Sequence, residues 1–345
     1  MKQSYLASAN GYKGFINLFS EIYDPNKFDR IFIIKGGPGT GKNTFMKKIC
    51  SCIENKKANI EYYYCSSDVT SLDGVIFHLN GKRIAILDGT APHERDAVYP
   101  GAIDEIVNLG DGLDISWLSS YRDKVIKLSN KKSQAYKSAY MYLSIAGKCD
   151  EEIYNIIEKH FSMDSAKKYI EKIKDSVIQC RKNEYRRLFV SYFNKNGYQS
   201  KNIDSEQITN CIKIGGDSRK AEFFIRLVNS HISSKYKLIL LSPLNSDHIE
   251  SVIFDNSLSL SADNENYDIN AEELFNDNKS INEETKYLSK VHDSLLEEAT
   301  RYFLIASNIH FEIENIYQSC MNFDINDAIF DKTYKKILKI CECAD

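Results

Sequence analysis

Residues 30–53 constrain the fold of this chain more than any other segment, because the sequence there indicates a buried strand, a glycine-rich loop and a helix in succession. Residues 30–34 read RIFII, a short apolar run rich in β-branched residues that predicts a buried parallel strand. The loop GGPGTGK comes next after Lys35, and the helical composition TFMKKICSCI begins after Asn43. This order predicts an α/β fold in which the loop joins a strand to a helix.

The glycine-rich loop has the composition of a phosphate-binding site. Glycine lets the backbone turn tightly and point N–H groups at an anion, and the following helix adds its positive dipole end. The pattern G-x-x-x-x-G-K places Lys42 where its ammonium contacts the β and γ phosphates of a nucleoside triphosphate. The residues that we expect to bind nucleotide are Gly36, Gly37, Pro38, Gly39, Thr40, Gly41, Lys42, Asn43 and Thr44.

One position of this loop departs from the usual pattern. Ser or Thr normally follows the lysine, because its hydroxyl is a ligand of the Mg²⁺ that bridges the phosphates, but this chain has Asn43. An amide oxygen is a ligand for hard cations, but Mg²⁺ tolerates little distortion from octahedral geometry. We therefore expect Asn43 to hold Mg²⁺ weakly, so that phosphoryl transfer is slow while nucleotide binding is kept.

A second apolar strand ends in a carboxylate. Asn80-Gly81 lies between two apolar runs and predicts a β-hairpin, whose second run, IAIL, ends at Asp88. Because the second motif of nucleoside triphosphatases has this form, we expect Asp88 to be a magnesium ligand and a catalytic residue with Lys42. No glutamate follows Asp88, and the next residues, DGTAPHERD, offer His93 to orient water. The alternatives that stay open for the base are Glu94, Asp96, Asp104 and Glu105.

The second half of the chain repeats the first in a degraded form. Residues 211–227 align without a gap on the first loop and helix, with Lys220 opposite Lys42, and Asp263 later stands opposite Asp88. The residues opposite Gly41, Asn43 and Thr44 are Arg219, Ala221 and Glu222. The second copy has therefore lost the tight turn and gained a negative charge where phosphate would lie, so we expect it to bind no nucleotide.

Glycine and proline become rare after each half, where apolar residues recur at helical spacing. We expect a mostly parallel sheet flanked by helices, duplicated in tandem, with a helical hairpin packed on each copy. The expected units are a nucleotide-binding domain (1–121), a helical hairpin (122–187), a degenerate loop domain (188–275) and a second hairpin (276–345). The acidic, Asn-rich residues 261–284 predict a mobile connector.

Charge and hydropathy limit the partners. The chain has 345 residues, with 45 basic against 48 acidic side chains and a net charge of −3, so it has no general attraction to nucleic acid or anionic lipid. No run of apolar residues is long enough to predict a membrane span or a signal peptide. We expect a cytoplasmic protein without a nucleic-acid or membrane partner, and we leave a protein partner open.

The motif segments resemble a family of bacterial tandem P-loop proteins described as ATPase-like. The resembling residues are GGPGTGKNTFMKKI, YYYCSSDVTSLDGVIF, ILDGTAPH and YPGAIDEIVNLGD. With the degenerate second half, the resemblance covers nearly the whole chain and implies a P-loop NTPase fold that binds ATP. Family members typically carry Ser or Thr after the loop lysine, and often a better preserved second loop, and this chain departs from both patterns.

Three functions remain open from the sequence. The leading hypothesis is an ATP-binding protein that hydrolyses ATP slowly with Mg²⁺, in which the second half is a pseudo-NTPase. The absence of an Asn-Lys-x-Asp guanine motif favours ATP over GTP. One alternative is a switch or scaffold that binds nucleotide without hydrolysis, and Asn43 keeps it open. The other alternative is a small-molecule or nucleotide kinase, which requires an arginine-rich lid.

Overall fold

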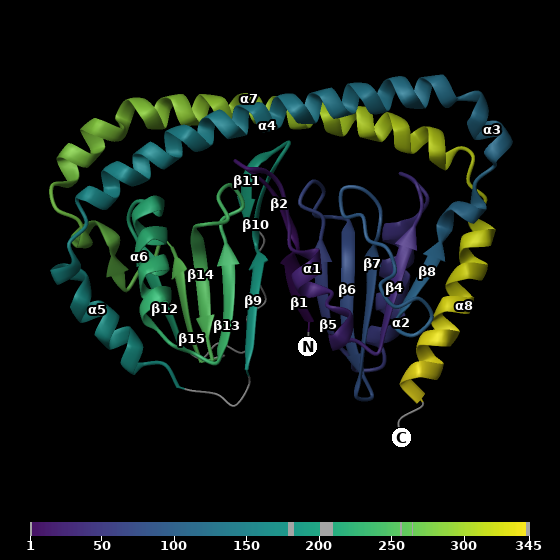
Figure 1. Ribbon diagram of the computed structural model, residues 1–345, viewed down its shortest axis with the longest axis horizontal. Helices are drawn as coiled ribbons and strands as arrows, with labels where there is room; N and C mark the ends of the chain where they lie inside the picture. Colours follow the sequence, from purple (N-terminus) through teal and green to yellow (C-terminus); the bar gives the residue numbers. More distant parts are fainter. Residues whose placement is uncertain (1, 179–182, 201–209, 256, 264, 343–345) are drawn as a thin grey trace.

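The computed structural model describes residues 2–178, 183–200, 210–255, 257–263 and 265–342, and its central feature is a 12-stranded sheet (Figure 1). The first-half strands are β1 (Lys2–Leu6), β4 (Arg30–Lys35), β5 (Asn59–Tyr64), β6 (Leu72–Leu79), β7 (Lys82–Asp88) and β8 (Asp104–Asn108). The second-half strands are β9 (Glu184–Phe189), β12 (Asn210–Gly215), β13 (Tyr236–Leu241), β14 (Ile249–Phe254), β15 (Leu258–Ala262) and β16 (Ile269–Asn270). Two separate hairpins are β2 (Ser8–Gly11) with β3 (Gly14–Asn17) and β10 (Ser191–Asn194) with β11 (Gly197–Ser200).

The two halves of the sheet have the same strand order when each is read outward from the middle. The first half runs β1-β5-β6-β7-β4-β8 and the second runs β9-β13-β14-β15-β12-β16. They join where β1 lies antiparallel to β9. In each half a single strand, β6 or β14, runs antiparallel to its neighbours, while the other strands of that half run parallel to one another, so the sheet as a whole is mixed.

The Asn80-Gly81 turn explains why β6 runs antiparallel to β7. Both turn residues have positive φ, 49° and 78°, and the register pairs Leu79 with Lys82 across them. This is the two-residue hairpin that the sequence predicted.

The helices divide into short ones beside the sheet and two long ones across it. Their bounds are α1 (Phe19–Ile22), α2 (Lys42–Glu54), α3 (Ile115–Ser120), α4 (Arg122–Lys159), α5 (Met163–Asp175), α6 (Ser218–His231), α7 (Asn278–Gln318) and α8 (Phe323–Glu342). Three 3-10 turns are η1 (Pro25–Lys27), η2 (Leu109–Gly112) and η3 (Ala271–Leu274). Among the helices in the described ranges, none combines the length and the apolarity that crossing a membrane requires.

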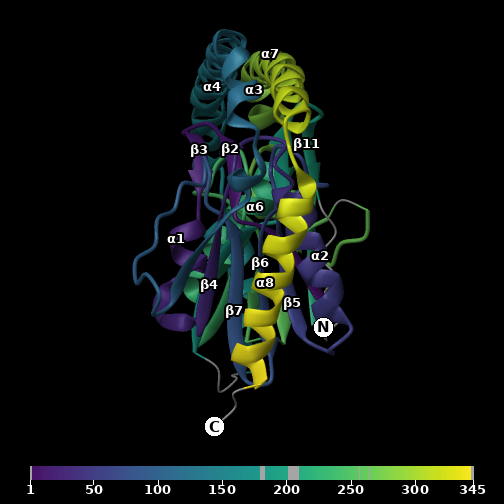
Figure 2. The same cartoon turned by 90° about the vertical axis from the view of Figure 1, so that its right-hand side faces the viewer.

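The long helices α4 and α7 lie side by side across both halves, and Figure 2 shows the pair end-on above the sheet. The rings of Tyr142 and Tyr302 stack between them with centroids 5.6 Å apart. The predicted hairpins, one folded back on each half, are therefore wrong, because each long helix pairs with the other and not with the helix that follows it.

The short helix after each long one packs on the half that the long helix has reached. Ala166 and Ile173 of α5 lie in the core of the second half, whereas Phe330 of α8 packs edge-on against Phe45 of α2 in the first. Each half is thus covered by a helix whose chain arrives from the other half.

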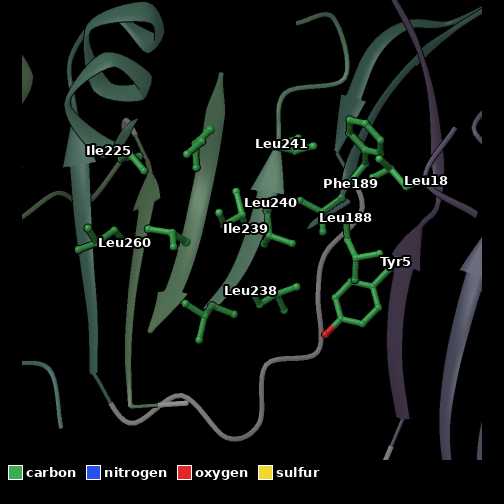
Figure 3. Close-up of a cluster of buried hydrophobic side chains, with 14 of the residues drawn as sticks. Tyr5, Leu18, Leu188, Phe189, Ile225, Leu238, Ile239, Leu240, Leu241 and Leu260 are labelled. Atoms are coloured by element: carbon green, nitrogen blue, oxygen red, sulfur yellow. The ribbon is translucent and has the colours of Figure 1, made fainter. Parts of the chain in front are cut away.

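One hydrophobic core crosses the junction of the halves. Figure 3 shows Tyr5 and Leu18 of the first half beside Leu188 and Phe189 of β9 and the residues of β13. The expected domains therefore share buried surface and are not separate lobes. Residues 261–284, expected as a connector, contain β16, η3 and the start of α7.

Candidate functional site

The glycine-rich loop lies where the sequence placed it, between the end of β4 and the start of α2. Residues 36–41 make this connection, and Lys42 is the first residue of the helix. Gly39 and Gly41 have φ of +72° and +84°, a backbone region that residues with a side chain rarely adopt. Gly41 is the N-cap of α2, so the unpaired N–H groups of that helix face the loop.

Lys42 and Asp88 meet at this loop. The Lys42 ammonium donates hydrogen bonds to the carbonyl oxygens of Gly36 and Gly37, at 3.0 and 2.9 Å, and lies 3.7 Å from Asp88 Oδ2. Asp88 Oδ1 accepts hydrogen bonds from the backbone and hydroxyl of Thr90 at 2.9 and 2.6 Å. Burial raises the pKa of Asp88, although Lys42 opposes the shift. The structure therefore brings together the loop, the lysine and the acid that the sequence singled out.

Asn43 does not point its amide oxygen at the loop. That oxygen accepts a hydrogen bond from the backbone N–H of Leu72 at 3.1 Å, while Thr44 is exposed. Thr40 is buried, and its hydroxyl donates to the Gly37 carbonyl at 2.9 Å. Within the described ranges, no three Asp, Glu, His or Cys residues form a group able to hold a metal. A Mg²⁺ ion would thus depend on Asp88, water and bound phosphates, and the donors fit it weakly.

The His93 side chain contacts Asp73 and Phe19. Its Nε2 lies 2.9 Å from Asp73 Oδ2, its ring stacks on Phe19 with centroids 4.5 Å apart, and it is 5% exposed. In the described part of the chain, no hydrogen bond or ion pair joins His93 to Lys42 or Asp88. The structure therefore gives His93 a buried polar contact and does not place it at the site.

Among the described residues, none of the alternative bases contacts Lys42. The β4–β8 register sets Asp104 beside Ile31 and Glu105 beside Phe32, toward the end of β4 opposite to the loop. Glu105 forms an ion pair with Lys336 of α8. Glu94 is exposed, and Asp96 lies 3.3 Å from the Lys35 ammonium. None of these contacts brings a carboxylate to Lys42.

The last turn of α7 lies against the loop, which the sequence did not predict. A Cβ on Gly39 would stand 2.7 Å from the Glu314 carbonyl oxygen, and one on Gly37 would stand 2.7 Å from the Tyr317 ring. From α8, the Asn326 amide donates to the Thr40 carbonyl at 2.8 Å. The signal in the sequence was only helical spacing, so nothing local linked these residues to a loop so far away along the chain.

A row of polar side chains from α4 and α7 lies near the contact between α7 and the glycine-rich loop. The Lys132 ammonium lies 3.3 Å from His310 Nδ1, and His310 Nε2 lies 3.6 Å from Glu314 Oε1. Burial, together with the nearby Lys132 and Lys42 ammonium groups, lowers the pKa of His310 to about 4. Burial also raises the pKa of Glu314, and Lys42 opposes that shift. The sequence analysis had selected none of these three residues.

The second loop is shorter than the alignment predicted. Residues 216 and 217 alone join β12 to α6, and four residues separate the end of β12 from Lys220, against six between the end of β4 and Lys42. The helix accordingly begins at Ser218, ahead of Lys220. The ungapped alignment is therefore wrong at this turn, because two residues of the cradle are missing.

Lys220 forms an ion pair with a carboxylate of its own chain, which keeps its ammonium from solvent. It is 1% exposed, and its ammonium donates to Glu272 Oε2 at 2.5 Å and to Asn278 Oδ1 at 2.7 Å. The other oxygen of Glu272 accepts from the backbone N–H of Asp217, the N-cap of α6, at 3.0 Å. Glu272 thus occupies the position, between lysine and helix N-terminus, that an anion would take.

The contacts of Asp263 and Arg219, which the alignment sets opposite Asp88 and Gly41, also differ from those of the first half. The registers set Asp88 beside Ile34 but Ala262 beside Ile214, so Ala262 and not Asp263 corresponds to Asp88. Asp263 pairs with Lys213 at 2.7 Å, and Arg219 pairs with Asp150 at 2.7 Å.

Glu222, opposite Thr44 in the alignment, is partly buried below α4. Its carboxyl accepts from the Tyr154 hydroxyl at 3.0 Å, and burial, with Glu250 nearby, raises its pKa to about 8. The second half therefore places ion pairs and buried carboxyls where the first has its open loop.

Comparison with family models, curated proteins and solved structures gives no match to this chain. The likeness of the motif segments to tandem P-loop proteins stays a resemblance of sequence. A functional assignment therefore depends on the contacts of the first loop and on how they differ from those of the second.

Proposed function

We propose that the first loop binds the polyphosphate of ATP and that the protein slowly hydrolyses ATP to ADP and phosphate. One observation carries this proposal: the Lys42 ammonium, the six-residue loop and the N-terminus of α2 converge beside the buried carboxylate of Asp88. A lysine held by loop carbonyls, next to free helix N–H groups, is an arrangement suited to a phosphate chain.

Each residue of the site has a separate part in this proposal. Loop and helix N–H groups would bind the β-phosphate, and Lys42 would bind the β and γ oxygens after leaving one of its carbonyl partners. Mg²⁺, when bound, supplies charge neutralisation between these phosphates. Asp88 would hold that ion, and Asn43, already bonded to Leu72, would contribute little, which is why we expect slow turnover.

We further propose that the second half is a degenerate copy of the first. The equal strand orders, the matching positions of α2 and α6 and the long helix after each half support a duplication. The short second loop and the Glu272–Lys220 ion pair support the loss of nucleotide binding in that copy. In this proposal, the second half has a structural role, because α7 leaves it to cover the first loop.

A nucleotide-dependent switch without hydrolysis is the second candidate function. It is favoured by the last turn of α7, whose Glu314 carbonyl and Tyr317 ring contact the loop. A ligand bound in the loop would therefore press against α7 and its partner helix α4. Such a protein would change the position of α7 when ATP binds and would release no phosphate.

Phosphate release by the purified protein separates these functions. Parent, Lys42→Ala and Asn43→Ser proteins are incubated with ATP and Mg²⁺, and free phosphate is measured over time. Slow release by the parent, abolished in Lys42→Ala, supports the ATPase. Nucleotide binding without release by the parent, with release restored in Asn43→Ser, favours the switch, whereas no binding at all contradicts both.

A further inference from the structure

The Lys132–His310–Glu314 row is the feature of the molecule that the proposed ATP site leaves unexplained. It joins α4 to α7 through His310, and its Glu314 end lies at the loop, since a Cβ on Gly39 would stand 2.7 Å from the Glu314 carbonyl oxygen. The three side chains are half-buried, so they are neither a solvated helix face nor part of the hydrophobic core. Half-buried polar side chains that two helices hold beside the glycine-rich loop indicate a binding site for a ligand.

Lys132 is the residue that points to the nature of that ligand. Its ammonium is half-buried, and burial lowers its pKa, yet among the described residues no carboxylate lies within 4.0 Å of it. Its hydrogen-bond partner is the imidazole of His310, whose low pKa keeps it neutral near pH 7. A partly desolvated ammonium with only a neutral partner favours the arrival of an anion.

Resting on the proposed function, we propose that α4 and α7 complete the site: Lys132 binds the terminal phosphate of a nucleoside triphosphate, and Glu314 accepts the proton of the attacking water. In this step the water oxygen bonds to the terminal phosphorus while the bond from that phosphorus to the bridging oxygen breaks. The electron pair leaves with ADP, and the proton passes to the Glu314 carboxylate. The products are ADP and inorganic phosphate.

The surroundings of Glu314 agree with this role. Burial raises the pKa of its carboxyl, which brings the group closer to the range in which a base both exists ionised and accepts a proton. Lys42 and Lys132 favour the ionised form, whereas Asp68 disfavours it. His310 links Glu314 to Lys132 and so acts as a positioning residue between them.

The first test measures the binding of ATP and ADP by titration calorimetry, which needs no turnover. Lys132→Ala should weaken ATP about tenfold and leave ADP unchanged, since one charge-assisted contact to the terminal phosphate is lost. The matched control is Lys131→Ala, because Lys131 is exposed and lines a groove on the outer side of the helix pair. Equal losses for both nucleotides, or no loss, would overturn the role of Lys132.

The second test follows phosphate release against pH. Glu314→Gln should keep ATP affinity, slow release about 10- to 100-fold and flatten its rise with pH, because the amide accepts no proton. Glu312→Gln, on the outer groove, should behave as the parent. An unchanged rate or an unchanged pH profile overturns the role of Glu314.

These outcomes are distinguishable from failure of the proposed function. If the parent binds neither nucleotide, the ATP site itself is wrong and this inference falls with it. If the parent binds ATP and loses it in Lys42→Ala, but Lys132→Ala keeps the preference for ATP over ADP, only the inference is wrong. If the parent binds ATP without releasing phosphate, the base role of Glu314 is wrong.

Discussion

The two strand–loop–helix units of this chain occupy the same position in their halves of the sheet and yet differ in what their lysines contact. Lys42 reaches back to two carbonyl groups of a six-residue loop, whereas Lys220 is held by Glu272 behind a two-residue loop. The first lysine can exchange a carbonyl for a phosphate at low cost. The second would have to leave a buried ion pair.

If the first loop binds phosphate as proposed, this difference teaches that a lysine at the right position is not enough for a phosphate site. What decides it is the length of backbone that can curve around the anion and whether the chain supplies an anion of its own. In the second half η3 brings Glu272 to the helix N-terminus, while the corresponding turn after β8, η2, contains glycines. Substitutions at five positions break or sharpen this comparison.

The largest effect is expected at the two lysines. Lys42→Ala should weaken ATP binding about 100-fold, because it removes charge-assisted hydrogen bonds to the phosphates. Lys220→Met should leave ATP binding unchanged and lower the free energy of unfolding by about 1 to 2 kcal/mol, because Glu272 loses its partner. Titration calorimetry and urea unfolding measure the two quantities. A loss of ATP binding in Lys220→Met alone would reverse the comparison.

Glycine at position 39 is the next test, because α7 contacts it. Gly39→Ala should lower the free energy of unfolding by about 2 kcal/mol, since its φ is +72° and the new Cβ would meet the Glu314 carbonyl at 2.7 Å. Gly197→Ala is the matched control, with φ of +77° and its nearest side-chain neighbour at 3.9 Å, and should lose only about 1 kcal/mol. Equal losses in thermal or urea unfolding would mean that α7 does not press on the loop.

The buried carboxyl of Glu222 makes the second half sensitive to pH. Its pKa of about 8 lies above that of an unfolded glutamate, so the stability it contributes is present at acidic pH and is lost as pH rises toward 8. The difference in free energy of unfolding between Glu222→Gln and the parent should therefore shift in favour of the variant by about 1 to 2 kcal/mol when the pH is raised from 5 to 8. The charged and titratable groups around Glu222 are Tyr154, His248, Glu250, Asp150 and Arg219.

Urea unfolding at the two pH values checks this prediction. Glu151→Gln, an exposed neighbour on α4, is the control and should follow the parent at both. If the parent is more stable at pH 8 than at pH 5, and Glu222→Gln does not change how the free energy of unfolding depends on pH, the Glu222 carboxyl is not protonated in the folded protein.

The smallest effect is expected at Asn43. Asn43→Ser restores a hydroxyl for Mg²⁺ but gives up the hydrogen bond to Leu72, so the ratio of ATP affinities with and without Mg²⁺ should rise only about threefold. Asn43→Ala loses the same hydrogen bond without adding a ligand and should show no rise. Equal ratios in the two variants would show that the hydroxyl position does not reach the metal.

The sequence predicted the first loop well because all of its parts are local. The strand before the loop, the positive-φ glycines and Lys42 at the start of the helix lie in one short segment, and Asn80-Gly81 fixes its hairpin in the same way. The meeting of Lys42 with Asp88 followed from parallel neighbouring strands. These contacts depend on local backbone preferences and on neighbouring strands, and both can be predicted from the pattern of the sequence.

The rest required the path of the chain through space. Helical spacing identified the segments of α4 and α7 but could not tell whether each would fold back or pair with the other, so Lys132 and Glu314 were not linked to the loop. The shorter loop of the second half could not be recognised, because the sequence aligns Lys220 with Lys42 without a gap. The stacking of His93 on Phe19 and its contact with Asp73 likewise depend on the fold and could not be predicted from the DGTAPHERD segment.

The number of ATP molecules bound per chain tests the central claim most directly. Equilibrium dialysis of the parent protein against labelled ATP, carried to saturation, should give one ATP per chain, bound at the first loop and lost in Lys42→Ala. Two ATP molecules per chain, or one that survives Lys42→Ala and disappears in Lys220→Met, would contradict the account.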